Sequence, residues 1–264
     1  MKKYQLLIVV TVLFIACTPA KMALDNNGWN EKEEFSVNGR QGILINQKLS
    51  FGDYRTVSVK RSWTKGNSMF AGWAWGRPGY DDYSRIIGVE FSNKKQSVKF
   101  ELSDQDANES SVFCVTKVKT KDFVLGNNPN SLLNISLEIL GRTDAAQNVF
   151  WTKIYLKNEE KPWEMMLDND AIQEKRKTYV GVISQSRDQY YTLHPVYALE
   201  MKNGKTGNIL AGSLGIEIRN KQGKPLAAVS LIDKGMVYFN GVSSEEKFLM
   251  ANICTALLLQ EQIA

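Results

Sequence analysis

The sequence predicts a mainly β protein, an antiparallel barrel of about twelve strands that encloses a hydrophobic helix at the C-terminal end. Two observations predict this class. Apolar residues occur in short runs separated by turn residues, almost never at the helical spacing. The last such segment, residues 248–259, carries polar side chains only at Asn252 and Thr255. A helix without a polar face must be surrounded by protein, and a barrel of many strands has an interior wide enough to hold it.

The first seventeen residues, "MKKYQLLIVVTVLFIAC", have the pattern of an export signal. Lys2 and Lys3 precede an apolar run from Leu6 to Ala16, which is about 11 residues long. That length suits a signal peptide and is short for a membrane-spanning helix, which needs about 20 residues. We therefore predict a signal peptide over residues 1–16. A buried N-terminal helix is the alternative.

The end of this signal, "FIAC" from Phe14 to Cys17, resembles the bacterial lipobox. Phe14 stands where leucine is usual. The resemblance implies cleavage before Cys17, lipidation of Cys17 and anchoring in a membrane, with residues 17–29 as the lipidated cysteine and a polar tether. Thr18 stands where an aspartate would favour the inner membrane, so the resemblance implies the outer membrane. No acidic surface-export stretch follows Cys17, which favours the periplasmic side. Residues 30–264 are then predicted to form a single β-rich domain.

Strands are predicted along most of this domain from alternating or short apolar runs between turn residues. Residues 85–102 have the form of a hairpin around a short polar turn, whereas residues 157–177 are polar and predict a loop with a short helical turn. The predicted strands cover residues 42–51, 54–63, 69–76, 85–92, 96–102, 111–119, 132–140, 149–156, 178–185, 190–201 and 208–218.

The C-terminal region gives the clearest pattern. Residues 214–239 alternate through three strands with turns at "NKQG" and "DKG", which predicts a three-stranded meander. Ser243 and Glu246 then have the spacing of a capping box, so the last helix is predicted to begin near Ser244. A β-sandwich with a docked C-terminal helix is the alternative architecture, although a sandwich fills its core from its own sheet faces.

The stretches "GIEIRNKQGKPLAAVSL" and "SSEEKFLMANICTALLLQEQ" resemble the C-terminal part of the tubby C-terminal-like superfamily. This superfamily includes tubby proteins, phospholipid scramblases and LURP-one-related proteins. The resemblance covers about the last fifty residues. It implies a twelve-stranded barrel closed around a hydrophobic helix, and relatives that engage membranes and anionic lipids. No phosphoinositide site of that family matches this sequence residue by residue.

The net charge of the chain argues against a nucleic-acid partner, and its cysteine content bears on whether a disulfide forms. The net charge of +5 becomes +3 when Lys2 and Lys3 leave with the signal, which is too weak to indicate a nucleic-acid partner. Cys114 and Cys254 remain after Cys17 is assigned to lipidation. Both lie in apolar runs, so buried free thiols are favoured over the disulfide that an oxidising compartment would allow.

No catalytic motif is present in the sequence. His194 is the single histidine and lies among strand-like aromatic residues, where a structural role is expected. The sequence has no nucleophile elbow, no phosphate-binding glycine loop and no metal-ligand spacing. We therefore expect a protein without enzymatic activity, metal or cofactor.

The most unusual stretch is the aromatic segment of residues 63–83. On a strand, Trp73 and Trp75 share one face, with Arg77 and Tyr80 close by in the sequence. An outward face would bind a ligand by stacking, whereas an inward face would fill the core, which is the commoner arrangement. The four residues are the candidate ligand-binding site.

Taken together, the sequence predicts a non-enzymatic, lipid-anchored envelope protein that binds a lipid, a membrane surface or a protein partner through its barrel. The alternatives are a glycan-binding lipoprotein that uses residues 63–83, and a lipoprotein with a structural or assembly role.

Overall fold

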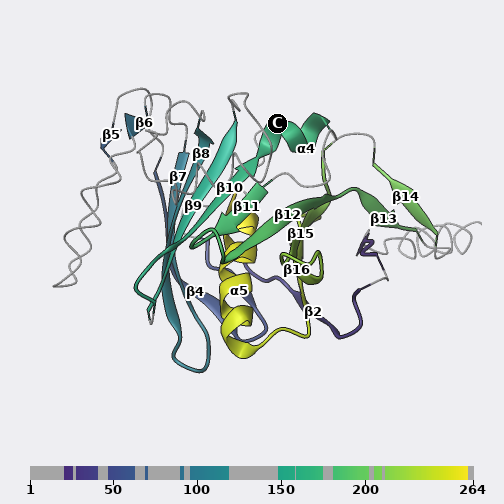
Figure 1. Cartoon of the computed structure of the whole chain (residues 1–264), viewed down its shortest axis with the longest axis horizontal. Helices are drawn as coiled ribbons and strands as arrows, with labels where there is room; N and C mark the ends of the chain where they lie inside the picture. The colour runs from purple at the N-terminus through teal and green to yellow at the C-terminus, as the bar shows by residue number, and fades with distance from the viewer. Residues whose placement is uncertain are drawn as a thin grey trace, which may run out of the picture.

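The protein is a twelve-stranded, antiparallel, nearly closed β-barrel around a C-terminal helix, as predicted (Figure 1). The computed structural model describes residues 21–25, 28–40, 47–62, 69–70, 90–91, 96–118, 148–157, 159–174, 181–201, 205–209 and 212–260. The barrel sheet has the order β2-β17-β16-β15-β12-β11-β10-β9-β8-β7-β4-β3.

The bounds of the barrel strands in chain order are β2 Lys32–Ser36, β3 Ser50–Phe51, β4 Tyr54–Ser62, β7 Gln96–Ser103, β8 Glu109–Val118, β9 Val149–Leu156, β10 Trp163–Asp168, β11 Gly181–Ser184, β12 Tyr190–Val196, β15 Gly215–Arg219, β16 Pro225–Ser230 and β17 Met236–Asn240. A separate sheet contains β1 Lys21–Met22, β13 Ala198–Glu200 and β14 Thr206–Asn208, and another pairs β5 Met69–Phe70 with β6 Glu90–Phe91. The described helices are α4 Asn169–Glu174 and α5 Ser244–Leu259.

The two edge strands of the barrel sheet, β2 and β3, meet through one bridge. The backbone N–H of Asn38 donates to the carbonyl of Ser50 at 2.9 Å, and the N–H of Ser50 donates to the carbonyl of Asn38 at 3.1 Å. Phe35 lies against Gly52 nearby, so closely that a Cβ on Gly52 would be 2.8 Å from the ring. Gly52 also has a φ of +52°, which favours glycine at this turn. These contacts bring the edges of the sheet together.

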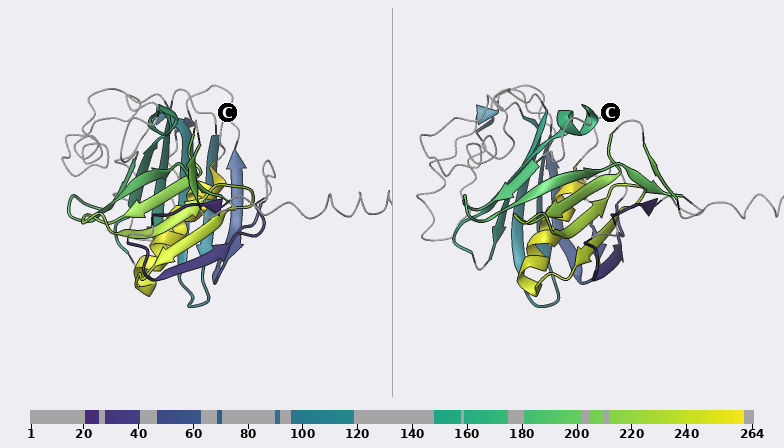
Figure 2. Two further views of the ribbon diagram at one scale, coloured as in Figure 1. Left: turned by 90° about the vertical axis from the view of Figure 1, so that its right-hand side faces the viewer. Right: turned by 45° about the vertical axis from the view of Figure 1, so that its right-hand side comes forward.

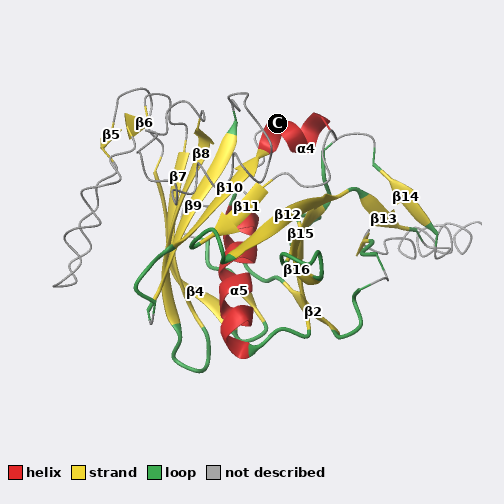
Figure 3. Ribbon diagram, viewed as in Figure 1, coloured by secondary structure: helices red, strands yellow, loops and turns green. Residues whose placement is uncertain are grey.

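Helix α5 passes through the middle of the barrel (Figure 3). Every residue from Phe248 to Leu259 is buried. Both views of Figure 2 place the helix between the strands of the C-terminal meander and the strands β4, β7, β8 and β9. The helix therefore has no surface side, as its uniformly apolar sequence predicts.

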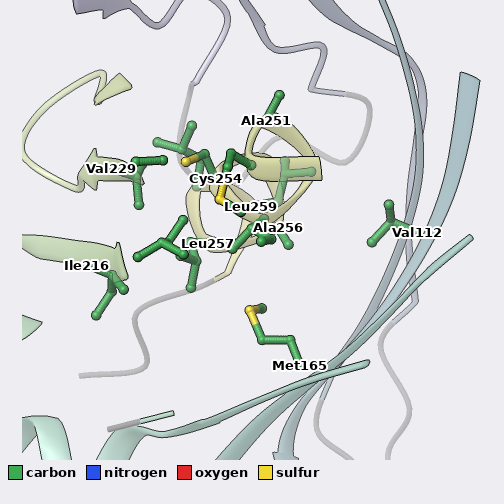
Figure 4. Close-up of a cluster of buried hydrophobic side chains, with 14 of the residues drawn as sticks. Val112, Met165, Ile216, Val229, Ala251, Cys254, Ala256, Leu257 and Leu259 are labelled. Carbon is green, nitrogen blue, oxygen red and sulfur yellow. The ribbon is translucent and has the colours of Figure 1, made fainter. Parts of the chain in front are cut away.

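Side chains from strands on different sides pack against this helix (Figure 4). Val112 of β8 lies on one side, and Ile216 and Val229 lie on the opposite side. Met165 of β10 reaches the helix from a third direction. The inward residues alternate with outward ones along each strand, so a single apolar cluster extends from the barrel wall to the helix.

At each end of α5, a side chain forms a hydrogen bond with a backbone group of the helix. At the N-terminus, the side chain of Ser243 accepts a hydrogen bond from the N–H of Glu246 at 3.3 Å, which confirms the predicted cap. At the C-terminus, Arg40 donates from Nε to the carbonyl of Leu258 at 3.2 Å. The same guanidinium also donates to the carbonyls of Leu231 and Asp233. Its positive charge lies at the negative end of the helix dipole.

The polar side chains of α5 are paired inside the core. Ser110 of β8 donates to Oδ1 of Asn252 at 2.5 Å, and Asn252 donates from Nδ2 to the carbonyl of Phe248 at 2.8 Å. Thr255 donates to the carbonyl of Ala251 at 2.8 Å. Because a buried polar group without a partner is costly, these bonds favour one position of the helix in the barrel.

Several local predictions can be compared with the structure. The meander is confirmed as β15, β16 and β17, and Cys114 and Cys254 are buried free thiols.

The hairpin predicted over residues 85–102 is wrong. Strand β7 pairs with β4 and β8, whereas β6 pairs with β5. Local alternation identifies strands, but distant segments decide which strands pair.

The polar stretch of residues 157–177 contains a strand that the sequence analysis missed. Strand β10 pairs with β9 and β11, and it leads directly into the short helix α4, where a helical turn was predicted. Its side chains are buried on both faces, including Met165 and Met166. The pattern therefore lacks the alternation of a half-buried strand.

Because α5 is enclosed on all sides, we expect a charge on any side of it to prevent folding. Ile253, Leu258 and Leu259 point in three directions around the axis, and each is at most 2% exposed. An unpaired carboxylate in the core costs several kcal/mol, against a typical total stability of about 5–15 kcal/mol. Ile253→Asp, Leu258→Asp and Leu259→Asp should each abolish the cooperative thermal unfolding transition.

The matched control is Glu245→Ala in the exposed first turn of α5, which should unfold almost like the wild type. One of the three aspartate variants that remained folded and monomeric would reveal an open side of the helix, and the enclosed position would be wrong.

Candidate functional site

A segment near the N-terminus crosses the outside of the barrel, and we call residues 21–31 the strap. Strand β1 at its start pairs antiparallel with β13, with Lys21 opposite Glu200 and Met22 opposite Leu199. Met22 is 4% exposed and Trp29 is 8% exposed. The described part of the strap therefore belongs to the folded domain.

The strap covers a second, smaller apolar cluster on the outer face of the meander. Its buried members come from the strap and from β16 and β17: Met22, Trp29, Ala228 and Tyr238. The rings of Trp29 and Tyr238 meet edge to face, with centroids 6.3 Å apart. Burial, together with the smaller effect of the charges of Glu34 and Glu200, raises the pKa of the Tyr238 hydroxyl to about 12. Tyr238 therefore stays neutral at physiological pH.

A buried carboxylate holds Trp29 in this position. Glu217 lies on the outer face of β15 and is only 3% exposed. The indole Nε1 of Trp29 donates to its Oε2 at 2.8 Å, and Nε of Arg219 donates to its Oε1. A carboxylate under an apolar cover is stable only when it is paired, so Glu217 needs both the indole and the guanidinium.

Asn240 provides the second attachment of the strap. Its Nδ2 donates to the carbonyl of Gly28 at 2.6 Å and to that of Pro225 at 2.8 Å, while its Oδ1 accepts from the N–H of Glu31 at 3.1 Å. Gly28 has a φ of +110°, and a Cβ there would be 3.2 Å from the ring of Pro225. One buried amide thus connects the strap to β16 and β17.

These contacts correct the expectation of a polar tether over residues 17–29. Residues 21–25 and 28–29 pack on the barrel, and Ala23 donates to the carbonyl of Ala198 at 2.8 Å. The polar composition of the stretch obscured this, because two well-spaced apolar residues, Met22 and Trp29, make most of the contact. A tryptophan in an otherwise polar segment was the signal that could have indicated docking.

The imidazole of His194 and the thiols of Cys114 and Cys254 lie in surroundings that indicate a structural role. Nε2 of His194 lies 2.9 Å from Oγ1 of Thr192, and His194 stands opposite Glu217 in the neighbouring strand. Burial raises the pKa of the Cys114 thiol to about 12 and also raises that of Cys254, so neither supplies a thiolate near neutral pH. Within the described ranges, no group of three or more metal-ligating side chains is found.

The sequence-predicted site residues lie outside the described residues. This holds for the lipidation site Cys17 and for the candidate ligand-binding residues Trp73, Trp75, Arg77 and Tyr80. Among the described residues, no helix has the length and hydropathy needed to cross a bilayer. The strap and the carboxylate beneath it are the features that the sequence analysis did not find.

Comparison with known proteins gave no relative. No protein-family model matches the chain, and no curated protein or solved structure matches it significantly.

Because the indole of Trp29 pairs a buried carboxylate, we expect Trp29→Phe to loosen the strap. The substitution keeps an aromatic ring but removes the donor to Glu217, and the loss should be about 1–3 kcal/mol in the free energy of unfolding. Amide hydrogen exchange should become faster in a peptide covering residues 21–31. Denaturant unfolding and exchange mass spectrometry measure the two effects.

Trp163→Phe is the matched control, since Trp163 also donates from its indole to a glutamate, Glu159, but does so far from the strap. Its variant should leave exchange in residues 21–31 unchanged. Equal exchange in the wild type and in Trp29→Phe would contradict the assigned role of the Trp29–Glu217 bond.

Proposed function

We propose that this chain is a non-enzymatic lipoprotein of the bacterial envelope, anchored through Cys17 in the outer membrane on the periplasmic side. Its barrel would bind a lipid, a membrane surface or a protein partner. The observation that carries the proposal is a signal and lipobox pattern over residues 1–17 ahead of a barrel whose interior is filled by α5. Because α5 occupies the inside, a partner would be met on the outer surface or at the ends of the barrel.

The architecture supports a lipid-related role by analogy. A twelve-stranded barrel around a C-terminal hydrophobic helix is the arrangement that the resemblance to the tubby C-terminal-like superfamily implied. Members of that superfamily engage membranes and anionic lipids. An anchored barrel would meet the same kind of surface at a high local concentration.

The surroundings of the reactive side chains support a role in binding. The imidazole of His194 is engaged by Thr192, and the thiols of Cys114 and Cys254 lie in the apolar core. Catalysis by a thiolate or imidazole requires a group that is accessible and activated. The proposal therefore assigns no reaction and no cofactor to the chain.

The anchor is tested with Cys17→Ala, because only a cysteine thiol at this position accepts the lipid. In a bacterial host the variant should remain unprocessed and should lack the acyl chains in the mass spectrum. It should also leave the outer-membrane fraction and remain with the inner membrane through its uncleaved signal.

Phe14→Leu is the control for this experiment, since it restores the usual lipobox residue and should preserve processing and lipidation. A Cys17→Ala chain of mature size in the outer-membrane fraction would contradict the lipoprotein proposal.

A glycan-binding role is the second candidate, based on the same-face spacing of Trp73 and Trp75. Arg77 and Tyr80 would supply polar contacts beside the two rings. If the rings form a stacking surface, the double substitution Trp73→Ala with Trp75→Ala should abolish glycan capture and barely shift the melting temperature. Glycan-array binding and thermal melts measure the two effects, and a loss of several kcal/mol in stability would instead identify both tryptophans as core residues.

A further inference from the structure

The covalent distance between the proposed anchor and the folded domain is short. Four residue steps separate Cys17 from Lys21, the first residue of β1. A fully extended chain covers at most about 3.6 Å per residue, so the Cα of Lys21 cannot lie farther than about 14 Å from that of Cys17. Any membrane that holds Cys17 must therefore lie close to β1.

Strand β1 belongs to a small sheet that stands beside the barrel. In Figure 1, β13 and β14 extend from the barrel at the right of the view, with β1 next to them. Lys21 pairs with Glu200, the last residue of β13, and Met201 follows directly. The Met201 N–H donates to the carbonyl of Lys205 at 2.8 Å, which closes the β13–β14 turn. Glu200 and Met201, at this end of the hairpin, thus lie next to Lys21.

An exposed apolar side chain lies at this turn. Met201 is 44% exposed, and its Cε lies over Gly207, only 2.4 Å from where a Cβ would stand. Only two other large apolar side chains within the described part of the chain are comparably exposed, Val57 at 51% and Tyr155 at 46%. They lie on β4 and β9, at the other side of the barrel in Figure 1.

The strap fixes the hairpin to the rest of the barrel. Its contacts through Trp29 and Asn240 hold residues 28–31 against β15, β16 and β17, and the backbone of Ala23 bonds to β13. A lipid on Cys17 would therefore hold the barrel in a restricted orientation, because only the short segment between Cys17 and Lys21 could let it rotate.

The charges around the turn do not by themselves indicate attraction to anionic lipid. Lys21 and Lys205 are exposed on this side, and so are Asp25 and Glu200. Lys202, which follows Met201 in the sequence, adds a third positive charge, so three positive and two negative groups leave only a small net charge. A membrane contact here would depend on the short anchor and on the apolar side chain of Met201, and only weakly on headgroup charge.

We propose that the end of the β13–β14 hairpin formed by Glu200, Met201 and Lys205, where the apolar side chain of Met201 is exposed, rests on the lipid bilayer that holds Cys17. The proposal depends on the lipid anchor of the proposed function. It adds an orientation: the small sheet faces the bilayer, and the β4 and β9 side of the barrel faces away from it.

The test uses the full chain, processed by the host and reconstituted in vesicles of phosphatidylethanolamine and phosphatidylglycerol. An environment-sensitive fluorophore is attached to a single new cysteine in Met201→Cys, Val57→Cys or Tyr155→Cys. The two native thiols are buried with raised pKa values, and the Cys17 sulfur is blocked by its lipid, so labelling is selective. Nitroxide-bearing lipids should quench the probe at position 201 several-fold more than the probe at position 57 or 155.

Two further measurements test whether the quenching at position 201 depends on headgroup charge and on the short anchor. Replacing phosphatidylglycerol by neutral phosphatidylcholine should leave the quenching at position 201 nearly unchanged, because the local net charge is small. A flexible Gly/Ser spacer of about ten residues inserted between Ala20 and Lys21 should lower this quenching while leaving the lipid on Cys17. Quenching that persisted after the insertion would overturn the dependence on a short anchor.

The mass of the purified chain separates this inference from the proposed function. If Cys17 carries no lipid, the proposed function fails and the inference fails with it. If Cys17 is lipidated but the probe at position 201 is quenched no more than those at positions 57 and 155, only the inference is overturned.

Discussion

Burial of an entirely apolar helix is the constraint on which this structure depends. The twelve residues from Phe248 to Leu259 are all buried, and each large apolar side chain among them contributes about 1.5–3 kcal/mol when removed from water. A sheet covers only one side of a helix. Twelve strands that curve around α5 cover all sides, so the strand number and the helix are consequences of each other.

The height of the barrel wall and the length of α5 agree with this enclosure of the helix. The 16 residues of α5 rise about 24 Å. The longest strand, β8, has 10 residues and covers about 33 Å along its own axis, or about 25 Å along the barrel at a typical tilt of about 40°. The helix is thus about as long as the wall is high. Arg40 bonds the carbonyl of Leu258 at one end of the helix, and the Ser243 cap bonds the N–H of Glu246 at the other.

The meander of β15, β16 and β17 connects the inside of the barrel to the outside. Its inward residues, such as Ile216 and Val229, pack around α5, while its outward residues Glu217, Ala228 and Tyr238 lie under the strap. The outer face is therefore a second, smaller core with a buried carboxylate in it. An N-terminal lipid would act on a segment that is already fixed to the strands holding the central helix.

The sequence by itself determined the fold class and the position of the helix. Uniform hydrophobicity from Phe248 to Leu259 requires surrounding protein, and the Ser243–Glu246 spacing marks the start of the helix through local hydrogen bonds alone. The alternation of apolar and polar residues was also sufficient to predict the meander of β15, β16 and β17, because short turns join these neighbouring strands. The cap and the meander depend on contacts between residues close in the chain, whereas the enclosure of the helix follows from its lack of a polar face.

Only the tertiary structure decided which distant segments meet. The pairing of β7 with β4, the closure between Asn38 and Ser50, and the burial of both faces of β10 all depend on partners that local alternation does not identify. The strap is the clearest case. Trp29 and Glu217 are 188 positions apart, and their bond exists because the barrel places an outward carboxylate beneath a segment whose own composition is polar.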